Sequence, residues 1–187
     1  MHKKVLPLIL LLASTMSFAN TDTDPSENSF NYLEAGLGSV KIDGVGNGLY
    51  LSLGGSGTFN NFIIGGHFSV DLQSGGEAKA SALKIGHYWD LNDTTDLVIS
   101  YNSSNLGLSI DGGASGESKE QSIKFGFLSL LSDTTSANVD ISVPLNGGGI
   151  GIDFGGNYWL NESTAIHVGH TVATGGGNTL LTFRFTL

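Results

Sequence analysis

Apolar and polar residues alternate along most of the chain from residue 30 onward. In the segment GLYLSLGG, Leu49, Leu51 and Leu53 fall on one side of an extended backbone, while glycine, tyrosine and serine fall on the other. The same period of two returns in FIIGGHFSVDL, SALKIGHYW, NVDISV and LLTFRFTL. Because successive side chains of a strand point to opposite faces, this pattern predicts strands with one apolar and one polar face.

Counting such segments gives ten expected strands, each with roughly the ten residues that a tilted strand needs to cross a bilayer. They cover residues 30–40, 47–57, 61–72, 79–91, 95–104, 119–131, 135–145, 149–160, 164–172 and 178–187. Short polar turns at 58–61, 91–95, 131–135 and 160–164 alternate with longer glycine-rich connections. This meander predicts an all-β fold, a closed up-and-down antiparallel transmembrane β-barrel of ten strands, with eight strands as the alternative.

Three of the short turns have nearly the same sequence. LNDTTD at 91–96 returns as LSDTTS at 131–136 and as LNESTA at 160–165. We interpret the similarity as a shared geometric task of hairpins at one end of the barrel, with duplication of a hairpin as the alternative.

The first 19 residues are typical of a secretory signal peptide. Lys3 and Lys4 precede an apolar run from residue 5 to residue 12, and Ser17 and Ala19 supply the small residues of a cleavage site. Residues 20–29 are polar and acidic, and we expect them to form a short leader. Residues 30–187 are then the barrel domain.

The charge balance limits the expected partners. Without Lys3 and Lys4, 6 basic residues stand against 17 acidic ones, so nucleic acid is not an expected partner. The sequence contains no cysteine, which excludes disulfides and thiolate metal sites, and we expect neither a metal centre nor a cofactor. The polar faces carry mostly small uncharged residues, which favours a membrane barrel over the alternative of a soluble β-domain.

Aromatic residues gather beside the short turns, where rings of a membrane barrel sit at headgroup level. The expected aromatic girdle consists of Phe59, Phe62, Trp89, Tyr158, Trp159 and Phe185. The last strand carries Phe183, Phe185 and Leu187 at alternate positions, which resembles the C-terminal assembly signal of bacterial outer-membrane barrels. The usual terminal residue of that signal is phenylalanine, so Leu187 departs from it.

The pattern of residues 30–187 resembles the small OmpA/OmpX-type barrels. The closest match lies in FNYLEAGLG, with Tyr32, Glu34 and Gly36, and in the hairpin that follows. The resemblance implies a monomer in the outer membrane of a Gram-negative bacterium. It also implies insertion by the outer-membrane barrel assembly machinery and contacts with outer-membrane lipids and lipopolysaccharide.

If the apolar face meets lipid, the polar face must point inward. The inward charges at mid-height are then three acids and three bases: Glu34, Lys84, Lys124, Asp140, Asp153 and Arg184. A charge in a narrow interior is stable when it is paired, so we expect an ionic network. Glu34 and Arg184 fall at similar heights on the first and last strands, which predicts an ion pair between them. The alternative is that these charges face trapped water separately.

Catalytic chemistry is less well supported. His67 and Asp71 share an inward face and could orient a general base, but no serine stands out as a nucleophile, so we do not expect an enzyme. Loop carboxylates could bind a divalent cation or bridge to lipopolysaccharide, although solvated carboxylates are the simpler interpretation; they are Asp71, Glu77, Asp111, Glu117 and Glu120.

The segment LGLSID changes parity, with Leu106, Leu108 and Ile110 on the opposite register to Tyr101. We interpret it as a strand extension past a bulge, with an exposed edge that recruits a partner. The expected function is therefore structural or surface-interacting. A narrow diffusion channel is the first alternative, and an outer-membrane enzyme acting on lipid is the second.

Overall fold

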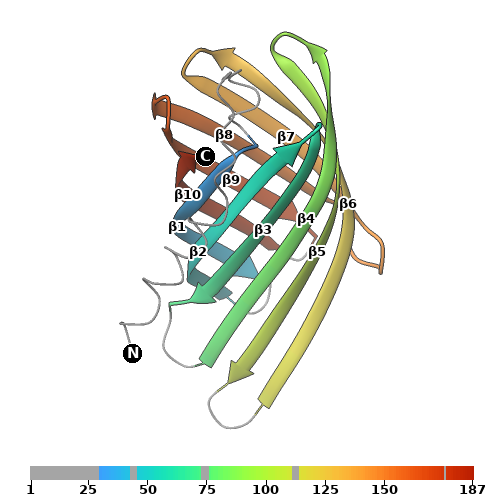
Figure 1. Ribbon diagram of the computed structural model, residues 1–187. Helices are drawn as coiled ribbons and strands as arrows, with labels where there is room; N and C mark the ends of the chain where they lie inside the picture. Colours follow the sequence, from blue (N-terminus) through green and yellow to red (C-terminus); the bar gives the residue numbers. More distant parts are fainter. Residues whose placement is uncertain (1–29, 43–45, 73–75, 111–113, 175) are drawn as a thin grey trace.

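The computed structural model describes residues 30–42, 46–72, 76–110, 114–174 and 176–187, which form a closed barrel (Figure 1). Its ten strands are β1 (Tyr32–Ile42), β2 (Gly46–Phe59), β3 (Phe62–Asp71), β4 (Gly76–Asn92), β5 (Thr95–Ile110), β6 (Ala114–Ser132), β7 (Thr135–Pro144), β8 (Gly151–Asn161), β9 (Thr164–Ala173) and β10 (Gly176–Thr186). Each strand pairs with its neighbours in the chain, and β1 pairs with β10 to close the sheet. The ten-strand prediction is confirmed, and the eight-strand alternative is wrong. The expected signal peptide and leader lie outside the described residues.

Within the described ranges, no helix is long and apolar enough to cross a membrane.

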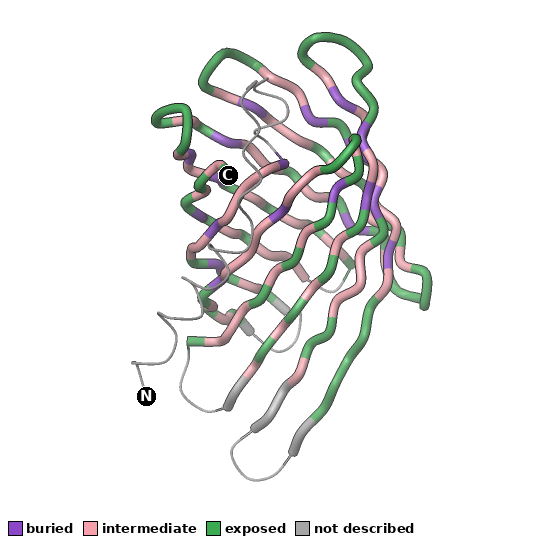
Figure 2. The backbone as a smooth tube through the Cα atoms, in the orientation of Figure 1, coloured by how far each residue is buried: buried purple, intermediate pink, exposed green. Residues whose placement is uncertain are grey.

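The two faces of the sheet have opposite polarity. Large apolar side chains such as Leu37, Ile64 and Phe125 are exposed on the outer surface. Polar side chains such as Ser52 and Thr182 are fully buried inside, with 0% exposure. Buried and exposed residues therefore alternate along the strands (Figure 2), as the period of two predicts.

Three of the short turns use the same hydrogen bonds. In the first, Asn92 Oδ1 accepts from the backbone N–H and the hydroxyl of Thr94, both at 3.0 Å. In the third, Asn161 Oδ1 accepts from Ser163 in the same way. In the second, Ser132 Oγ takes the acceptor's place and receives the Thr134 N–H at 3.3 Å. Each turn also follows a register shift in the strand before it, so the repeated sequence serves one repeated geometry.

The fourth short turn is built differently. Asn60 and Asn61 have φ angles of 49° and 64°, in the left-handed region that asparagine tolerates better than most residues. Phe59 and Phe62 pair directly on either side of it, without a register shift. We call the end of the barrel that carries these four turns the short-turn end, and the opposite end the long-loop end.

Strands β4, β5 and β6 extend past the others at the long-loop end (Figure 1). The pairing of β3 with β4 stops at Val70 and Lys79, whereas β4 and β5 stay paired as far as Gly76 and Ile110. On the other side, the pairing of β6 with β7 begins only at Ser122. We call residues 76–82, 103–110 and 114–121 of these strands the sheet extension.

The expected bulge in LGLSID is absent, because the register of β5 runs unbroken from Thr95 to Ile110 on the β6 side. Leu106 is opposite Ala80 on β4 and opposite Ser118 on β6, so β5 has no free edge here. The edge prediction is therefore wrong for β5. The strand is regular here, and the pattern changes only because an apolar residue, Leu106, occupies an inward position.

Candidate functional site in the barrel interior

Glu34 and Arg184 meet inside the barrel where β1 pairs with β10. They are directly opposite in the register, and Arg184 Nε donates to Glu34 Oε2 at 2.8 Å. The hydroxyl of Thr182, two residues before Arg184, donates to the same oxygen at 3.1 Å. The side chains of Glu34 and Arg184 are 7% and 14% exposed, so this charged hydrogen bond forms largely out of water.

Arg184 also reaches over β9 to the next strand. Its Nη1 donates to Asn157 Oδ1 at 2.8 Å, and Asn157 in turn donates to Ser136 Oγ at 3.0 Å. His167 Nδ1 lies 3.0 Å from the same Asn157 oxygen. The guanidinium lies 4.1 Å from the centre of the Tyr32 ring, a favourable cation–π distance. Glu34, Ser136, Asn157, His167, Thr182 and Arg184 thus form one connected set, which we call the seam network.

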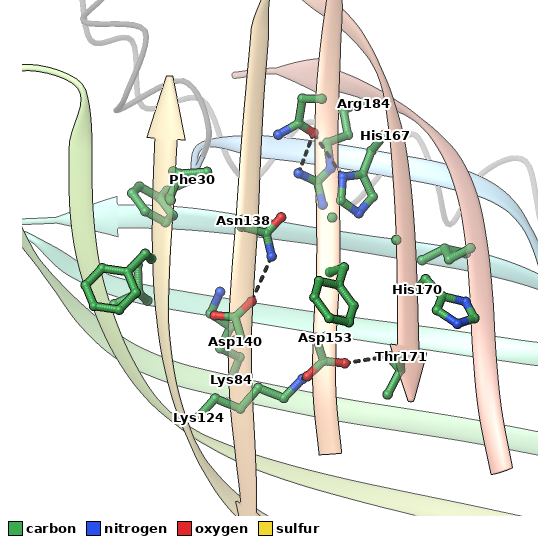
Figure 3. A pocket seen from close by; sticks show the side chains of 18 of the residues that line it. Phe30, Lys84, Lys124, Asn138, Asp140, Asp153, His167, His170, Thr171 and Arg184 are labelled. Carbon is green, nitrogen blue, oxygen red and sulfur yellow. Dashed lines mark hydrogen bonds and ion pairs between the residues drawn. The ribbon is translucent and has the colours of Figure 1, made fainter. Parts of the chain in front are cut away.

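A second set of charges lies farther around the wall. Lys124 Nζ on β6 reaches across β7 to Asp153 Oδ2 at 2.7 Å, and Thr171 donates to the other oxygen of Asp153. Asp140 is directly opposite Asp153 in the register and accepts from Asn138 Nδ2 at 2.7 Å. Figure 3 shows the Lys84 side chain beside Asp140, and the two opposite charges attract.

We call this set the lysine–aspartate network; its members are Lys84, Lys124, Asn138, Asp140, Asp153 and Thr171. With the seam network, it contains the six inward charges expected at mid-height; Asp71 and the buried Asp96 are further inward carboxylates outside the two networks. Glu34 pairs with Arg184, Lys124 pairs with Asp153, and Lys84 lies beside Asp140. The two networks thus hold equal numbers of acids and bases in close opposition.

A cavity of about 240 Å³ lies between the two networks. Five of these six charges line it (Figure 3), and the sixth, Glu34, is held by Arg184. The other side of this cavity is apolar and includes Phe30, Val98 and Leu128.

The apolar side belongs to a cluster that the sequence interpretation missed. Phe30, Ile63, Tyr88, Val98 and Leu128 are each 7% exposed or less and form a single core cluster. The last four occupy inward positions near the short-turn end of β3 to β6. We call this cluster the apolar floor. Runs such as FII, HYW and LVI, in which apolar residues occupy both faces, are the signal that could have revealed it.

A hydrogen bond also ties β2 to β10 across β1. The Tyr50 hydroxyl donates to Asn178 Oδ1 at 2.5 Å. The tyrosine ring passes directly over Gly38 of β1, where a Cβ atom would lie 2.1 Å from the ring. Glycine at this position therefore makes the crossing possible.

The histidine that was considered as a general base has a different environment from the expected one. Both ring nitrogens of His67 lie within 3.4 Å of Ser52 Oγ, at 3.4 and 3.3 Å. Ser52 is fully buried, so a lipid substrate has no route to its hydroxyl. The arrangement suits a structural hydrogen bond better than a nucleophile and its base.

The residues of the expected girdle do not all lie on one face. Five of them are exposed on the outer surface near the short-turn end: Phe59, Phe62, Trp89, Tyr158 and Phe185. Trp159 differs, because alternation along β8 places it on the inward side with Asn157, between the outward-facing Tyr158 and Leu160. Two adjacent residues of one strand cannot both face lipid, and the sequence interpretation overlooked this constraint. Phe183 and Leu187, of the expected assembly signal, share the outer face of β10 with Phe185.

Of the carboxylates considered for a divalent cation, the described ones lie on two strands that are not neighbours, Asp71 on β3 and Glu117 and Glu120 on β6. Glu117 and Glu120 are exposed on β6, while Asp111 and the Glu77 side chain lie outside the described parts of the chain. Among the described residues, no three His, Cys, Asp or Glu side chains come together as a metal site would require.

Comparison with known proteins extends the fold assignment. The sequence matches no protein-family model and no curated protein. The structure resembles the KdgM porin in complex with disordered oligogalacturonate, with a TM-score of 0.53 at 8% identity over 83% of this chain and 99% of that chain. The KdgM porin alone gives a TM-score of 0.51 at the same identity and coverage. Neisserial surface protein A gives 0.42 at 14% identity, over 83% of this chain and 96% of that one. The chain therefore has the fold of the small outer-membrane β-barrels.

Proposed function

We propose that this chain is an integral outer-membrane protein whose barrel is closed at rest and whose role is structural and surface-interacting. The observation that carries the proposal is the filled interior. Two polar networks occupy one part of the cross-section and the apolar floor occupies the other. A ten-strand barrel has an interior little wider than its own side chains, so these side chains leave room for one cavity of about 240 Å³ and support a closed barrel over a wide pore.

The polarity of the two faces supports a membrane location. Exposed leucine, isoleucine and phenylalanine side chains cover the outer surface, whereas ionic groups are collected inside. In water this arrangement would leave a large apolar surface solvated, and in a bilayer it places each surface in its preferred medium. The expected export signal and the fold together favour the outer membrane of a Gram-negative bacterium, with the short turns in the periplasm.

The sheet extension supports a role in surface contact. Its outer face continues the lipid-facing positions of β4 to β6 but carries Lys79, Ser81, Asn105 and Lys119 in place of apolar residues. This change of polarity marks where the sheet leaves hydrocarbon. The extension would then stand in the headgroup and sugar layer of lipopolysaccharide, where the two lysines face anionic groups.

The β6 edge of the extension supplies the contact surface. Residues 116–120 are exposed, and Asn146 ends the pairing with its side-chain amide, which donates to the Lys119 carbonyl at 2.8 Å and accepts from the Gln121 N–H at 3.3 Å. Beyond this point β6 has β5 on one side and no described strand on the other. An extended segment of a partner could add to this edge. We also propose that the barrel assembly machinery inserts the chain and that the chain is a monomer.

The barrel itself is tested by outer-membrane fractionation and by migration on gels with and without heating. The expected result is a compact band in unheated detergent samples that shifts on boiling. A purified chain that is native and monomeric in buffer without detergent would contradict the membrane location.

Conductance in planar bilayers tests the closed state. We expect no ion-sized conductance steps from the unmodified protein at moderate voltages. The cavity lined by charged side chains supports the alternative, a narrow diffusion channel, and steady conductance steps would favour that alternative.

A further inference from the structure

The residue that closes the short-turn end comes from outside the strands. Phe30 precedes β1 and belongs to no strand, yet it is 6% exposed. Its ring stacks on that of Tyr88 with the centroids 4.8 Å apart and the planes 22° apart. Tyr88 lies on β4, and β2 and β3 separate this strand from β1. The Phe30 side chain therefore crosses part of the barrel mouth instead of lying against its own wall.

Four neighbouring strands contribute the apolar side chains against which Phe30 packs. Ile63, Tyr88, Val98 and Leu128 come from four consecutive strands, β3 to β6, and all are buried with Phe30. On the far side of Phe30 lies the charged cavity, which Phe30 itself lines (Figure 3). Phe30, together with Val98 and Leu128, thus lies between the charged cavity and the short-turn end on this side of the barrel.

The residue after Phe30 is bonded to β2 and to the end of the chain. Asn31 accepts at Oδ1 from the backbone N–H of Thr58 at 2.7 Å and from its hydroxyl at 3.0 Å. The Asn31 carbonyl accepts from the Leu187 N–H at 3.1 Å. By contrast, the charges of the seam network sit on strands that are paired along their whole length. Because the pairing of β1 begins at Tyr32, the Phe30 side chain can move without breaking a strand pair of the sheet.

We propose that Phe30 is a withdrawable plug, and that its exit from the cluster with Ile63, Tyr88, Val98 and Leu128 opens a narrow path from the cavity to the short-turn end. The proposal rests on the closed resting state proposed above. It assigns the closing of the short-turn end, on the side of β3 to β6, to Phe30, which lies just before β1. The species admitted would be water and small ions, because the cavity beyond holds paired lysines and aspartates.

Conductance of Phe30→Ala in planar bilayers is the first test. The matched control is Phe59→Ala, which removes an exposed ring on the outer surface at the same end. We expect ion conductance at least tenfold above that of the unmodified protein for Phe30→Ala, and no change for the control. Phe30→Leu should restore closure, because a branched apolar side chain still packs against the cluster.

A second test uses the absence of cysteine in the chain. Ile63→Cys, a fully buried position that Phe30 covers, should react slowly with a small water-soluble maleimide, and Phe59→Cys should react fast. Adding Asn31→Ala removes the two side-chain bonds to Thr58 and should speed labelling at position 63 several-fold. This variant also answers the question if Phe30→Ala fails to fold.

Two results would overturn the plug: a folded Phe30→Ala barrel as silent as Phe59→Ala, or labelling of Ile63→Cys that Asn31→Ala leaves unchanged. A conducting unmodified protein would instead contradict the closed resting state. If the unmodified protein conducts less than Phe30→Ala, only the closed resting state is contradicted. If the two conduct equally, the plug is contradicted as well.

Discussion

Arg184 donates to Glu34 across the line where the sheet closes, and the same guanidinium also binds Asn157 two strands away. One buried cation thus links three strands, β1, β8 and β10. A carboxylate facing such a group gains a charged hydrogen bond and loses most of its water. Removing either partner would leave an uncompensated charge in the interior, which is more costly than losing the bond itself.

Glu34→Ala and Arg184→Ala should each lower the free energy of unfolding by about 3–5 kcal/mol, the range for breaking a buried ion pair. The double variant should lose clearly less than the sum, because neither charge then remains unpaired. Urea titrations of the folded fraction in lipid vesicles, read from the gel shift, measure all three variants. Strictly additive losses would show that the contact carries no coupling energy.

Gly38→Ala should destabilise the barrel by about 1–3 kcal/mol, since the new methyl group overlaps the Tyr50 ring. The matched control is Gly116→Ala, where an added Cβ meets nothing within 4 Å. Tyr50→Ser should recover part of the loss in the Gly38→Ala background by removing the ring. If Gly38→Ala and Gly116→Ala behave alike in the same titration, the ring does not need the space above Gly38.

Asn92→Ala should cost about 1 kcal/mol, because the N–H of Thr94 loses its acceptor in the turn. Asn92→Ser should cost less, since Ser132 fills the same place in the second turn. The comparison needs only the unfolding midpoints of the two variants. Equal midpoints for alanine and serine would mean that the repeated side chain does not stabilise the turn.

Ile85→Lys should destabilise the inserted barrel by about 2–4 kcal/mol, the cost of a lysine near the middle of a bilayer. Ser81→Lys, four residues away on the same face of β4, should cost clearly less, because Ser81 lies nearer the long-loop end, where it is paired with Phe68 of β3. Refolding yields into vesicles give the comparison. Similar yields for the two variants would place the membrane boundary elsewhere on β4.

The alternation of residues was enough to predict the barrel and the inward face. Glu34 and Arg184 could be paired in advance because first and last strands must meet in any closed meander. The Phe30 cluster could not, since Phe30 lies outside the strands and its contacts depend on where the chain turns into the barrel. The unbroken register of β5 was also hidden, because Leu106 changes the pattern of polarity while the backbone continues unchanged.

The meeting of β1 with β10 has a consequence for how the protein matures. Glu34 and Arg184 are 150 positions apart, and their strands become neighbours when the sheet closes. Before β1 pairs with β10, Glu34 does not have Arg184 beside it, and its carboxylate lacks this partner. Closure of the sheet and pairing of the two charges are therefore one event, in which the net charge of the chain stays the same and only the distance between the two charges changes.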